Sequence, residues 1–290
     1  MKPSNAVKFK TKAKSRAVVE VSFSLKAGES QWFLLTADRH WDNPKSDQIL
    51  QKKHLEQAKE RGAGIIDIGD LFCAMQGKYD PRGTKNDVRP EHNKTNYLDA
   101  LIETASNFFS PYAENFIVIG QGNHESSILK RQETDLTTRL VERINTKAGS
   151  NIHRGGFSGW VVLRGNIGGN AWITKRVAWH HGYGGDAPVT KGVIQTNRMA
   201  VYLPDADFVL TGHTHNEWQF PIPRVRITSQ GRIFHDEQLH LKTPTYKEEY
   251  VDGFGGWHIE RGGPPKPVGA LWLRAYLESD ELKYEVTRAK

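Results

Sequence analysis

Apolar positions in the first half of the chain follow two alternating patterns. Continuous apolar runs, clearest at 65–68 and 116–119, predict buried strands. Between the runs, apolar residues recur every three or four positions, as they do on one face of a helix. Helices are predicted in this way over 46–61, 96–109 and 134–147. This order of strands and helices predicts an α/β layered fold with a largely parallel sheet.

Both ends of the chain are predicted to be β-rich. Residues 17–25 and 31–36, separated by a turn at 27–30, predict an opening β-hairpin. The second half predicts, in order, a hairpin over 160–163 and 172–179, a helix around 191–202, a strand at 208–210 and β-rich structure ending in a strand at 269–277. The chain is therefore expected to form one domain over 17–290, with a β-rich C-terminal extension.

Composition narrows the class of protein. A chain of 290 residues with 37% hydrophobic residues can bury a sizeable core. The single cysteine, Cys73, excludes an internal disulfide framework and fits a reducing compartment. No apolar stretch approaches the ~20 residues that span a bilayer, and no signal peptide is recognisable. We therefore expect a cytoplasmic protein without a membrane partner; the sequence does not determine the oligomeric state.

The formal net charge of +7 is concentrated at the N-terminus. Residues 1–16 contain six basic residues and no acidic one, so the rest of the chain carries only +1. The six are Lys2, Lys8, Lys10, Lys12, Lys14 and Arg16. We expect residues 1–16 to form a disordered basic arm, which is either simply solvated or contacts the phosphate backbone of a nucleic acid.

Polar clusters follow the apolar runs at five places. They are Asp38-x-His40, Gly69-Asp70, Asn123-His124, His180-His181 and His213-x-His215. Each cluster alone is equally typical of a turn or a helix cap. The carboxyl ends of strands in an α/β sheet form a shared crevice, however, so all five are expected to converge. Residues two apart in extended backbone also point to the same side, which pairs Asp38 with His40, and His213 with His215.

The side chains of these clusters have the chemistry of metal ligands. Imidazoles, carboxylates and one amide, with no thiolate pair, suit Mn²⁺, Fe, Zn²⁺, Co²⁺ or Ni²⁺ better than Ca²⁺. There are too many for one tetrahedral ion, so we expect two divalent ions, Mn²⁺ first among them and Mg²⁺ a further alternative. Two ions ~3.5–4 Å apart form a clamp suited to phosphoryl transfer.

The five clusters, over roughly residues 33–216, resemble the calcineurin-like metallophosphoesterase superfamily, whose signature is D-x-H, G-D-x-x-D, G-N-H-[DE], H and G-H-x-H. The resemblance implies a four-layer αββα sandwich of two mixed sheets flanked by helices, with the metals at the sheet edges. It also implies roles for single residues. Asp38, His40 and His215 would hold one ion, Asn123, His181 and His213 the other, Asp70 would bridge them, and His124 would act on the leaving oxygen without binding metal.

Two positions leave the ligand set open. The fourth cluster offers both His180 and His181; the family places its ligand directly before a glycine, which favours His181 and leaves His180 beside the site.

Members with the full second motif carry an acidic residue where this chain has Cys73. A thiol is a poor partner for an imidazolium, so His124 is either a weaker acid or is oriented by another group. Alternatively, Cys73 is simply a small buried residue. We expect Cys73→Asp to raise phosphoesterase activity.

The sequence leaves several substrates open. The segments Gly69–Cys73 and Gln121–Gly122 depart from the G-D-x-V-D-R-G and R-G-N-H-E motifs of the superfamily's serine/threonine protein phosphatases. The chain resembles phage and prophage phosphoesterases more closely, which would place it in the host cytoplasm. A long polar loop carries Arg82 and Arg89, which either contact substrate phosphate or are solvated.

The expected function is hydrolysis of phosphate esters, as a phosphodiesterase or phosphatase on nucleic acid or nucleotides. The alternatives are a phosphomonoesterase on a protein or small molecule, and a non-catalytic scaffold of the same fold.

Overall fold

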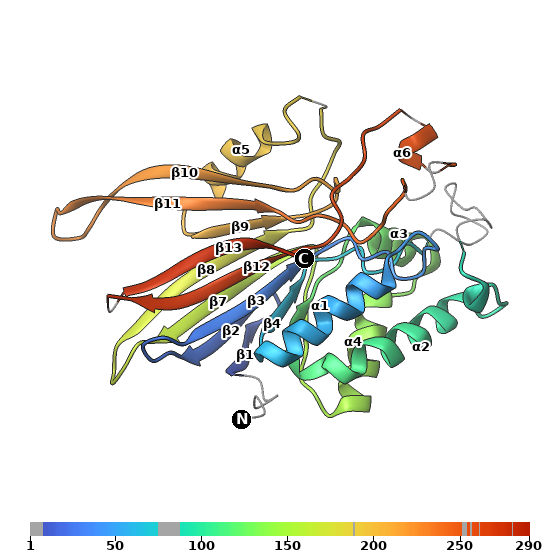
Figure 1. Ribbon diagram of the computed structural model, residues 1–290, viewed down its shortest axis with the longest axis horizontal. Coiled ribbons are helices and arrows are strands. Elements are labelled where there is room, and N and C mark those ends of the chain that lie inside the picture. Colours follow the sequence, from blue (N-terminus) through green and yellow to red (C-terminus); the bar gives the residue numbers. More distant parts are fainter. Residues whose placement is uncertain are drawn as a thin grey trace.

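Two β-sheets packed face to face form the centre of the molecule (Figure 1). The computed structural model describes residues 8–74, 88–187, 189–250, 254–255, 257–260, 262–279 and 281–290. The first sheet has the order β1 (Phe9–Ser15), β2 (Val18–Ser24), β7 (Ser158–Asn166), β8 (Trp172–His180), β9 (Phe208–Thr211), β11 (Ile233–Lys242) and β10 (Trp218–Ile227). The second has the order β13 (Glu281–Ala289), β12 (Ala270–Glu278), β3 (Ser30–Thr36), β4 (Gly64–Asp67), β5 (Phe116–Ile119) and β6 (His153–Arg154).

Helices cover the outer face of the second sheet and part of the outer face of the first. The α-helices are α1 (Gln48–Arg61), α2 (Tyr97–Phe109), α3 (Asn123–Gln132), α4 (Leu136–Ala148), α5 (Ile194–Tyr202) and α6 (Trp257–Glu260); short 3₁₀ helices span Pro90–His92 and Ser110–Asn115. The helices α1, α2 and α4 pack on the second sheet, on the right in Figure 1. On the other side of the molecule, Met199 of α5 packs on Ala178 and Val209 of the first sheet.

One large part of the core lies between the two sheets, and another lies between the second sheet and its helices. Buried side chains such as Val21 and Val161 of the first sheet meet Leu35, Ile117 and Leu273 of the second. Together with the outer helices this makes four layers, so the expected αββα sandwich of two mixed sheets is confirmed. The C-terminal region is β-rich as expected, but its strands complete both sheets instead of forming a separate extension.

The predicted helices are present with shifts of a few residues, and local capping explains their ends. The helix α1 begins at Asp47, whose carboxylate accepts a hydrogen bond from the Leu50 amide, and ends at Gly62 in the left-handed conformation. The helix α4 repeats the pattern with Asp135 and Gly149. Helix α3 was not predicted, because the polar sequence from Asn123 reads equally well as a turn.

The N-terminal segment differs from the prediction in two ways. Phe9–Ser15 forms strand β1 instead of a disordered arm, so that expectation is wrong for this segment; residues 1–7 lie outside the described part of the chain. Strand β2 pairs with β1 and β7, so the predicted hairpin of β2 with β3 is also wrong. The apolar faces of β2 and β3 both point into the core, and they meet across the two sheets.

Strands of both sheets end at the same rim of the sandwich. In the second sheet β3, β4 and β5 are parallel neighbours, and in the first sheet β8 and β9 are. Each of the five polar clusters directly follows one of these strands. None of the described helices is both long and apolar enough to cross a membrane.

Two buried histidines are expected to make the protein less stable in acid. Burial lowers the pKa of His54 and His240 to about 4, whereas an unfolded histidine titrates near ~6.5. Between these values the unfolded chain binds more protons, so stability is lost as the pH falls from about 6.5 towards 4. With about 1.4 kcal/mol for each pKa unit, each histidine is expected to lower the free energy of unfolding by roughly 3 kcal/mol.

The check is urea unfolding at pH 7 and pH 4 of the wild type and of His54→Gln. Glutamine keeps a polar group for the Tyr246 hydroxyl, which lies 2.8 Å from the His54 Nδ1 atom, but it does not titrate. The variant is expected to lose less stability between the two pH values. Equal losses would show that His54 does not contribute.

Candidate metal centre

The backbone of the five clusters is held in an uncommon conformation. Nine non-glycine residues of the described chain have positive φ, and five of them are predicted metal ligands. These five are Asp38, His40, Asp70, His213 and His215. Such strain persists only where the surrounding structure imposes it, and it gathers at functional sites. The residues therefore lie in tight turns past the strand ends, so the extended backbone assumed for the i, i+2 pairs is wrong, although both pairs reach the centre.

One group of side chains surrounds Asp38, whose side chain is fully buried. Its Oδ1 atom lies 3.4 Å from Nε2 of His215 and 4.0 Å from Nε2 of His40. The two imidazole Nε2 atoms are 3.1 Å apart. The Asp38 Oδ2 atom accepts a hydrogen bond from the His213 amide at 2.9 Å, which connects this group to the last cluster. The three side chains could hold one metal ion.

A second group surrounds Asp70 and Asn123. The Asp70 Oδ2 atom lies 3.1 Å from Nε2 of His181. The Asn123 Oδ1 atom lies 3.1 Å from the same Nε2 and 2.7 Å from Nδ1 of His213. These nitrogen and oxygen atoms point at one another, and Asp70, His181 and His213 have ligand atoms within 4.8 Å of one another. They could hold a second ion.

The other nitrogen of each imidazole in the second group has a backbone partner. The His181 Nδ1 atom lies 3.2 Å from the Ile68 carbonyl oxygen, and the His213 Nε2 atom lies 3.0 Å from that of Gly184. In a neutral imidazole, a nitrogen that donates to a carbonyl leaves the other nitrogen of the ring unprotonated and free to bind metal.

His181 and His180 point in different directions. His181 is fully buried and faces Asp70, as described above. His180 accepts a hydrogen bond from the Gly182 amide at 3.0 Å and packs on the rings of Phe157 and Tyr183. The structure therefore brings His181, and not His180, to the other predicted ligands.

The electrostatics of the centre favour the metal-binding charge states of Asp70 and His40, whereas they hold His181 in its protonated form. Burial alone would raise the pKa of Asp70, but His181 and His124 lower it well below its usual range, so the carboxylate stays ionised. Burial, together with His124 and His215, lowers the pKa of His40, which keeps that ring neutral. Burial also opposes the charged form of His181, but the Asp70 carboxylate raises its pKa to about 9. Metal binding at His181 would release this proton.

Two features of the centre are consistent with a bound metal ion. One is a buried carboxylate oxygen without a hydrogen-bond partner, and the other is a set of nitrogen and oxygen ligand atoms. Within the described chain the buried Asp38 Oδ1 atom has no hydrogen-bond partner, which is costly for a carboxylate unless a cation neutralises it. The imidazole, carboxylate and amide donors match Mn²⁺, Fe or Zn²⁺. The residues present therefore fit divalent ions.

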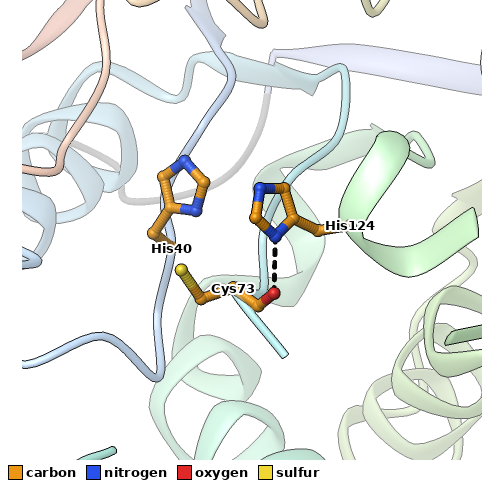
Figure 2. Close-up of side chains that lie close together, drawn as sticks. All are labelled: His40, Cys73 and His124. Atoms are coloured by element: carbon orange, nitrogen blue, oxygen red, sulfur yellow. Dashed lines mark hydrogen bonds between the residues drawn. The ribbon is translucent and has the colours of Figure 1, made fainter. Parts of the chain in front are cut away.

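Catalysis would depend on His124, which is oriented by a backbone atom (Figure 2). Its Nδ1 atom lies 2.5 Å from the carbonyl oxygen of Cys73, so the ring donates its Nδ1 proton there. Its Nε2 atom lies 3.7 Å from the Asp70 carboxylate. Burial raises the pKa of the Cys73 thiol, which therefore stays protonated. The group that orients His124 is thus the main chain at position 73, whatever its side chain.

This contact changes the premise of the Cys73→Asp prediction. A carboxylate at position 73 would compete for a nitrogen that already has a partner, and it would lie beside the buried Asp42 carboxylate. The gain in activity stays a prediction. It is checked by comparing kcat and its pH profile in the wild type and the variant, and unchanged values would contradict it.

Sequence reasoning missed three buried polar side chains that support the centre. Arg39 lies between two predicted ligands and donates to the Asp67 carboxylate at 2.5 Å, with both side chains fully buried. Asp42 accepts hydrogen bonds from the amides of Cys73 and Ala74. Glu125 accepts from the amides of Gly122, Asp70 and Phe72 and so fastens two clusters together. The signal was their position next to ligands, but their partners are far away in sequence.

The two arginines predicted to contact substrate phosphate are not placed in the centre by the described structure. Arg82 lies outside the described residues. Arg89 is half-buried, and its guanidinium donates to the carbonyl oxygens of Asn43 and Ser46 at 3.1 and 2.9 Å. These bonds give Arg89 a structural role, and its contact with substrate stays a prediction.

Glycines let the two loops of the centre approach each other closely. A Cβ atom at Gly122 would lie 2.1 Å from Asp70 Oδ1, although the Gly122 backbone is extended and open to any residue. We therefore expect Gly122→Ala to displace the Asp70 carboxylate and to weaken Mn²⁺ binding at least tenfold, measured by titration calorimetry. Gly156→Ala is the matched control, since its new Cβ would come no closer than 3.5 Å to its neighbours. Equal Mn²⁺ affinity in both variants would contradict this geometry.

Comparisons with known proteins provide only distant likenesses. No family model and no curated protein matches the chain. Vacuolar Protein Sorting 29 of Cryptosporidium parvum is 14% identical, over 90% of this chain and 98% of that one, with a TM-score of 0.38. A predicted phosphoesterase of Streptococcus pneumoniae TIGR4 is 12% identical, over 90% and 91%, with a TM-score of 0.33. GAP50 of Plasmodium is 12% identical, over 89% and 84%, with a TM-score of 0.42. At these values the likenesses carry no conclusion about activity.

Proposed function

We propose that this protein hydrolyses phosphate esters with the help of two divalent metal ions, as the resemblance of its motifs to calcineurin-like metallophosphoesterases suggests. The observation that carries the proposal is the convergence of seven ligand-type side chains from five separate strand ends. Five of the seven have left-handed backbone, and one of them has an unpartnered buried carboxylate oxygen. A structural hydrogen-bond network would not require that strain or that orphaned charge.

Each residue of the centre has a role in this proposal. One ion would be held by Asp38, His40 and His215 and the other by Asn123, His181 and His213, with Asp70 between them. Bound ions supply Lewis-acid stabilisation of the phosphoryl oxygens and acidify the attacking water. Mn²⁺ is the ion we expect first, and Fe, Zn²⁺, Co²⁺, Ni²⁺ and Mg²⁺ are alternatives.

His124 is proposed as the catalytic residue. With its Nδ1 proton on the Cys73 carbonyl oxygen, its Nε2 atom is the one directed at the centre, on the Asp70 side. When the ring is doubly protonated, it can donate its Nε2 proton to the leaving oxygen or stabilise the charge of the transition state. Its fixed orientation supports this role, because a ring that is already oriented loses no rotational freedom on catalysis.

The proposed substrates are phosphodiesters or phosphomonoesters of nucleic acids and nucleotides. The excess of basic residues supports an anionic polymer over a small neutral substrate. A phosphomonoesterase acting on a protein or small molecule is the second candidate. A non-catalytic scaffold is the third, since the acidic partner of the catalytic histidine is replaced by Cys73.

A substrate panel separates these candidates. The metal-free protein is supplied with Mn²⁺, Zn²⁺ or Mg²⁺ and offered p-nitrophenyl phosphate, bis-p-nitrophenyl phosphate, single-stranded DNA and double-stranded DNA. We expect turnover that requires metal and is lost on chelation. Preference for the bis ester supports a phosphodiesterase, and preference for the mono ester supports a phosphomonoesterase. Stoichiometric metal binding without turnover of any substrate would overturn the proposal in favour of the scaffold.

A further inference from the structure

In the described structure, the outer face of the first sheet is open over β1, β2 and the parts of β7 and β8 around Arg164 and Trp172. The inner positions of these strands, such as Val21 and Leu163, are fully buried, so the alternate positions point outward. The strand register places Lys10 beside Ser22, which lies beside Arg164, and Lys12 beside Glu20. These outward side chains are exposed or half-buried. The helix α5 packs only farther along the sheet, on Ala178 and Val209.

This open face carries an excess of positive charge. Its cations are Lys10, Lys12, Lys14, Arg164 and Arg176, which together with Trp172 we call the basic face. Among these strands Glu20 is the one acidic side chain at an outward position in the described structure, and it pairs with Lys14 and Arg164. The cations thus outnumber the carboxylates by four. Lys10 and Lys12 are two residues apart on an edge strand, so they are spaced by ~6.8 Å in a row.

An exposed aromatic ring lies within the same face. Trp172 is 45% exposed at the start of β8, and its ring lies 5.0 Å from the guanidinium carbon of Arg164. Nearly half of this large aromatic side chain stays in contact with solvent, so it can still stack on a ligand. A cation stacked on an exposed ring is a pair that also stacks on nucleic-acid bases.

We propose that the basic face binds single-stranded nucleic acid, with its cations on the phosphate backbone and Trp172 stacked on a base. A row of positive charge beside an exposed aromatic ring on a sheet is the combination by which single strands are bound without sequence preference. The aromatic ring favours nucleic acid over an anionic membrane, since a lipid headgroup offers no base to stack on. In this proposal, part of the basic N-terminal segment contributes to binding as strand β1 of the basic face and not as a disordered arm.

The basic face is separate from the metal centre. Strand β8 runs from Trp172 to His180, next to the metal-side His181, so along that strand Trp172 lies ~26 Å and Arg176 ~13 Å from the centre. The proposal therefore stands whether or not the protein is a phosphoesterase. If the protein is a phosphoesterase, the basic face would hold one part of a nucleic-acid strand while another part of that strand reaches the metal centre.

The test measures binding in a chelator, where hydrolysis does not interfere. Fluorescence anisotropy of a labelled 20-nucleotide oligo(dT) is followed with the wild type over a range of salt concentrations. We expect log K to fall with log salt with a slope of about −2 to −3, as three or four phosphate contacts require. The variant Lys10→Glu, Lys12→Glu, Arg176→Glu is expected to bind at least tenfold more weakly and with a shallower slope.

Matched variants separate binding by the basic face from a general effect of the protein's net charge. Lys52→Glu, Lys53→Glu, Arg143→Glu changes the charge equally on exposed positions of the helical layer, and it is expected to keep most of the affinity. Trp172→Ala is expected to weaken binding on the order of tenfold, whereas Trp172→Phe retains a stacking ring and should restore it. Thermal unfolding of each variant verifies that it folds.

Three outcomes would overturn the proposal. The first is equal loss of affinity in the two charge-reversal variants, which would reflect net charge alone. The second is unchanged binding in the Trp172→Ala variant. The third is binding to phosphatidylglycerol vesicles that the basic-face variant weakens as strongly as it weakens oligo(dT) binding, which would identify a general polyanion surface.

Discussion

Replacing Asp70 with asparagine is expected to abolish metal-dependent hydrolysis, with a fall in kcat/KM of about 10³-fold or more. The carboxylate is buried, and its Oδ2 atom lies 3.1 Å from the His181 Nε2 atom. Its Oδ1 atom accepts a hydrogen bond from the His124 amide at 2.9 Å, so the residue also holds the loop that carries His124. Lewis-acid stabilisation is worth several kcal/mol, and each ~1.4 kcal/mol is a factor of ten.

The measurement pairs kinetics with metal content. Wild type and Asp70→Asn are loaded with Mn²⁺, and bound metal is counted by atomic emission before turnover of bis-p-nitrophenyl phosphate is followed. The variant is expected to hold fewer ions as well as to lose activity. Asp99→Asn, with an exposed side chain, is the matched control. Full metal content and full activity in Asp70→Asn would show that the carboxylate does not bridge the ions.

Replacing His124 with alanine is expected to lower kcat by roughly 10²- to 10⁴-fold while the metals stay bound. The ring donates to the Cys73 carbonyl oxygen and is not needed to complete either of the two ligand groups around Asp38 and Asp70. Its loss should therefore remove proton transfer and leave the ions in place. This separates it from Asp70→Asn, which is expected to affect both.

The control for this variant is His180→Ala, which removes a neighbouring imidazole that faces away from the centre. Its kcat is expected to stay within a few-fold of the wild type. A substrate with a very good leaving group needs little protonation, so the loss in His124→Ala should also shrink for such a substrate. An equal loss for good and poor leaving groups would mean that His124 stabilises charge and does not transfer a proton. Wild-type kcat in His124→Ala would remove it from the mechanism.

Local sequence patterns were sufficient to predict which side chains meet at the centre. The apolar runs ended where β3, β4, β5, β8 and β9 end, because a strand buried between layers needs mostly apolar side chains, whereas the polar side chains past its end find partners at the rim. Metal ligands come from a few residue types, so five such clusters at strand ends were recognisable without coordinates. The helices α1, α2 and α4 were predictable for the same reason, since their apolar periodicity is encoded within a few residues, and so are the side-chain caps of α1 and α4.

Pairing between distant segments was not predictable from those patterns. Strands β2 and β3 follow each other closely in sequence but lie in different sheets, because each buries an apolar face that the other can cover. The basic segment around Lys12 became strand β1 because Phe9 is buried in the core between the sheets. Charge and alternation describe each segment separately, whereas a sheet requires a partner whose free edge and apolar face both match.

The sequence by itself determined which residue types meet at the rim of the sandwich and therefore that metal and phosphate chemistry are expected there. Only the tertiary structure decided which of two adjacent histidines faces Asp70, because that depends on the turn after β8. It also decided that a backbone carbonyl at position 73 orients His124, a contact that no side-chain pattern encodes. Sequence motifs specify which side chains can act as metal ligands, but the direction in which each side chain points depends on contacts between residues that are far apart in the chain.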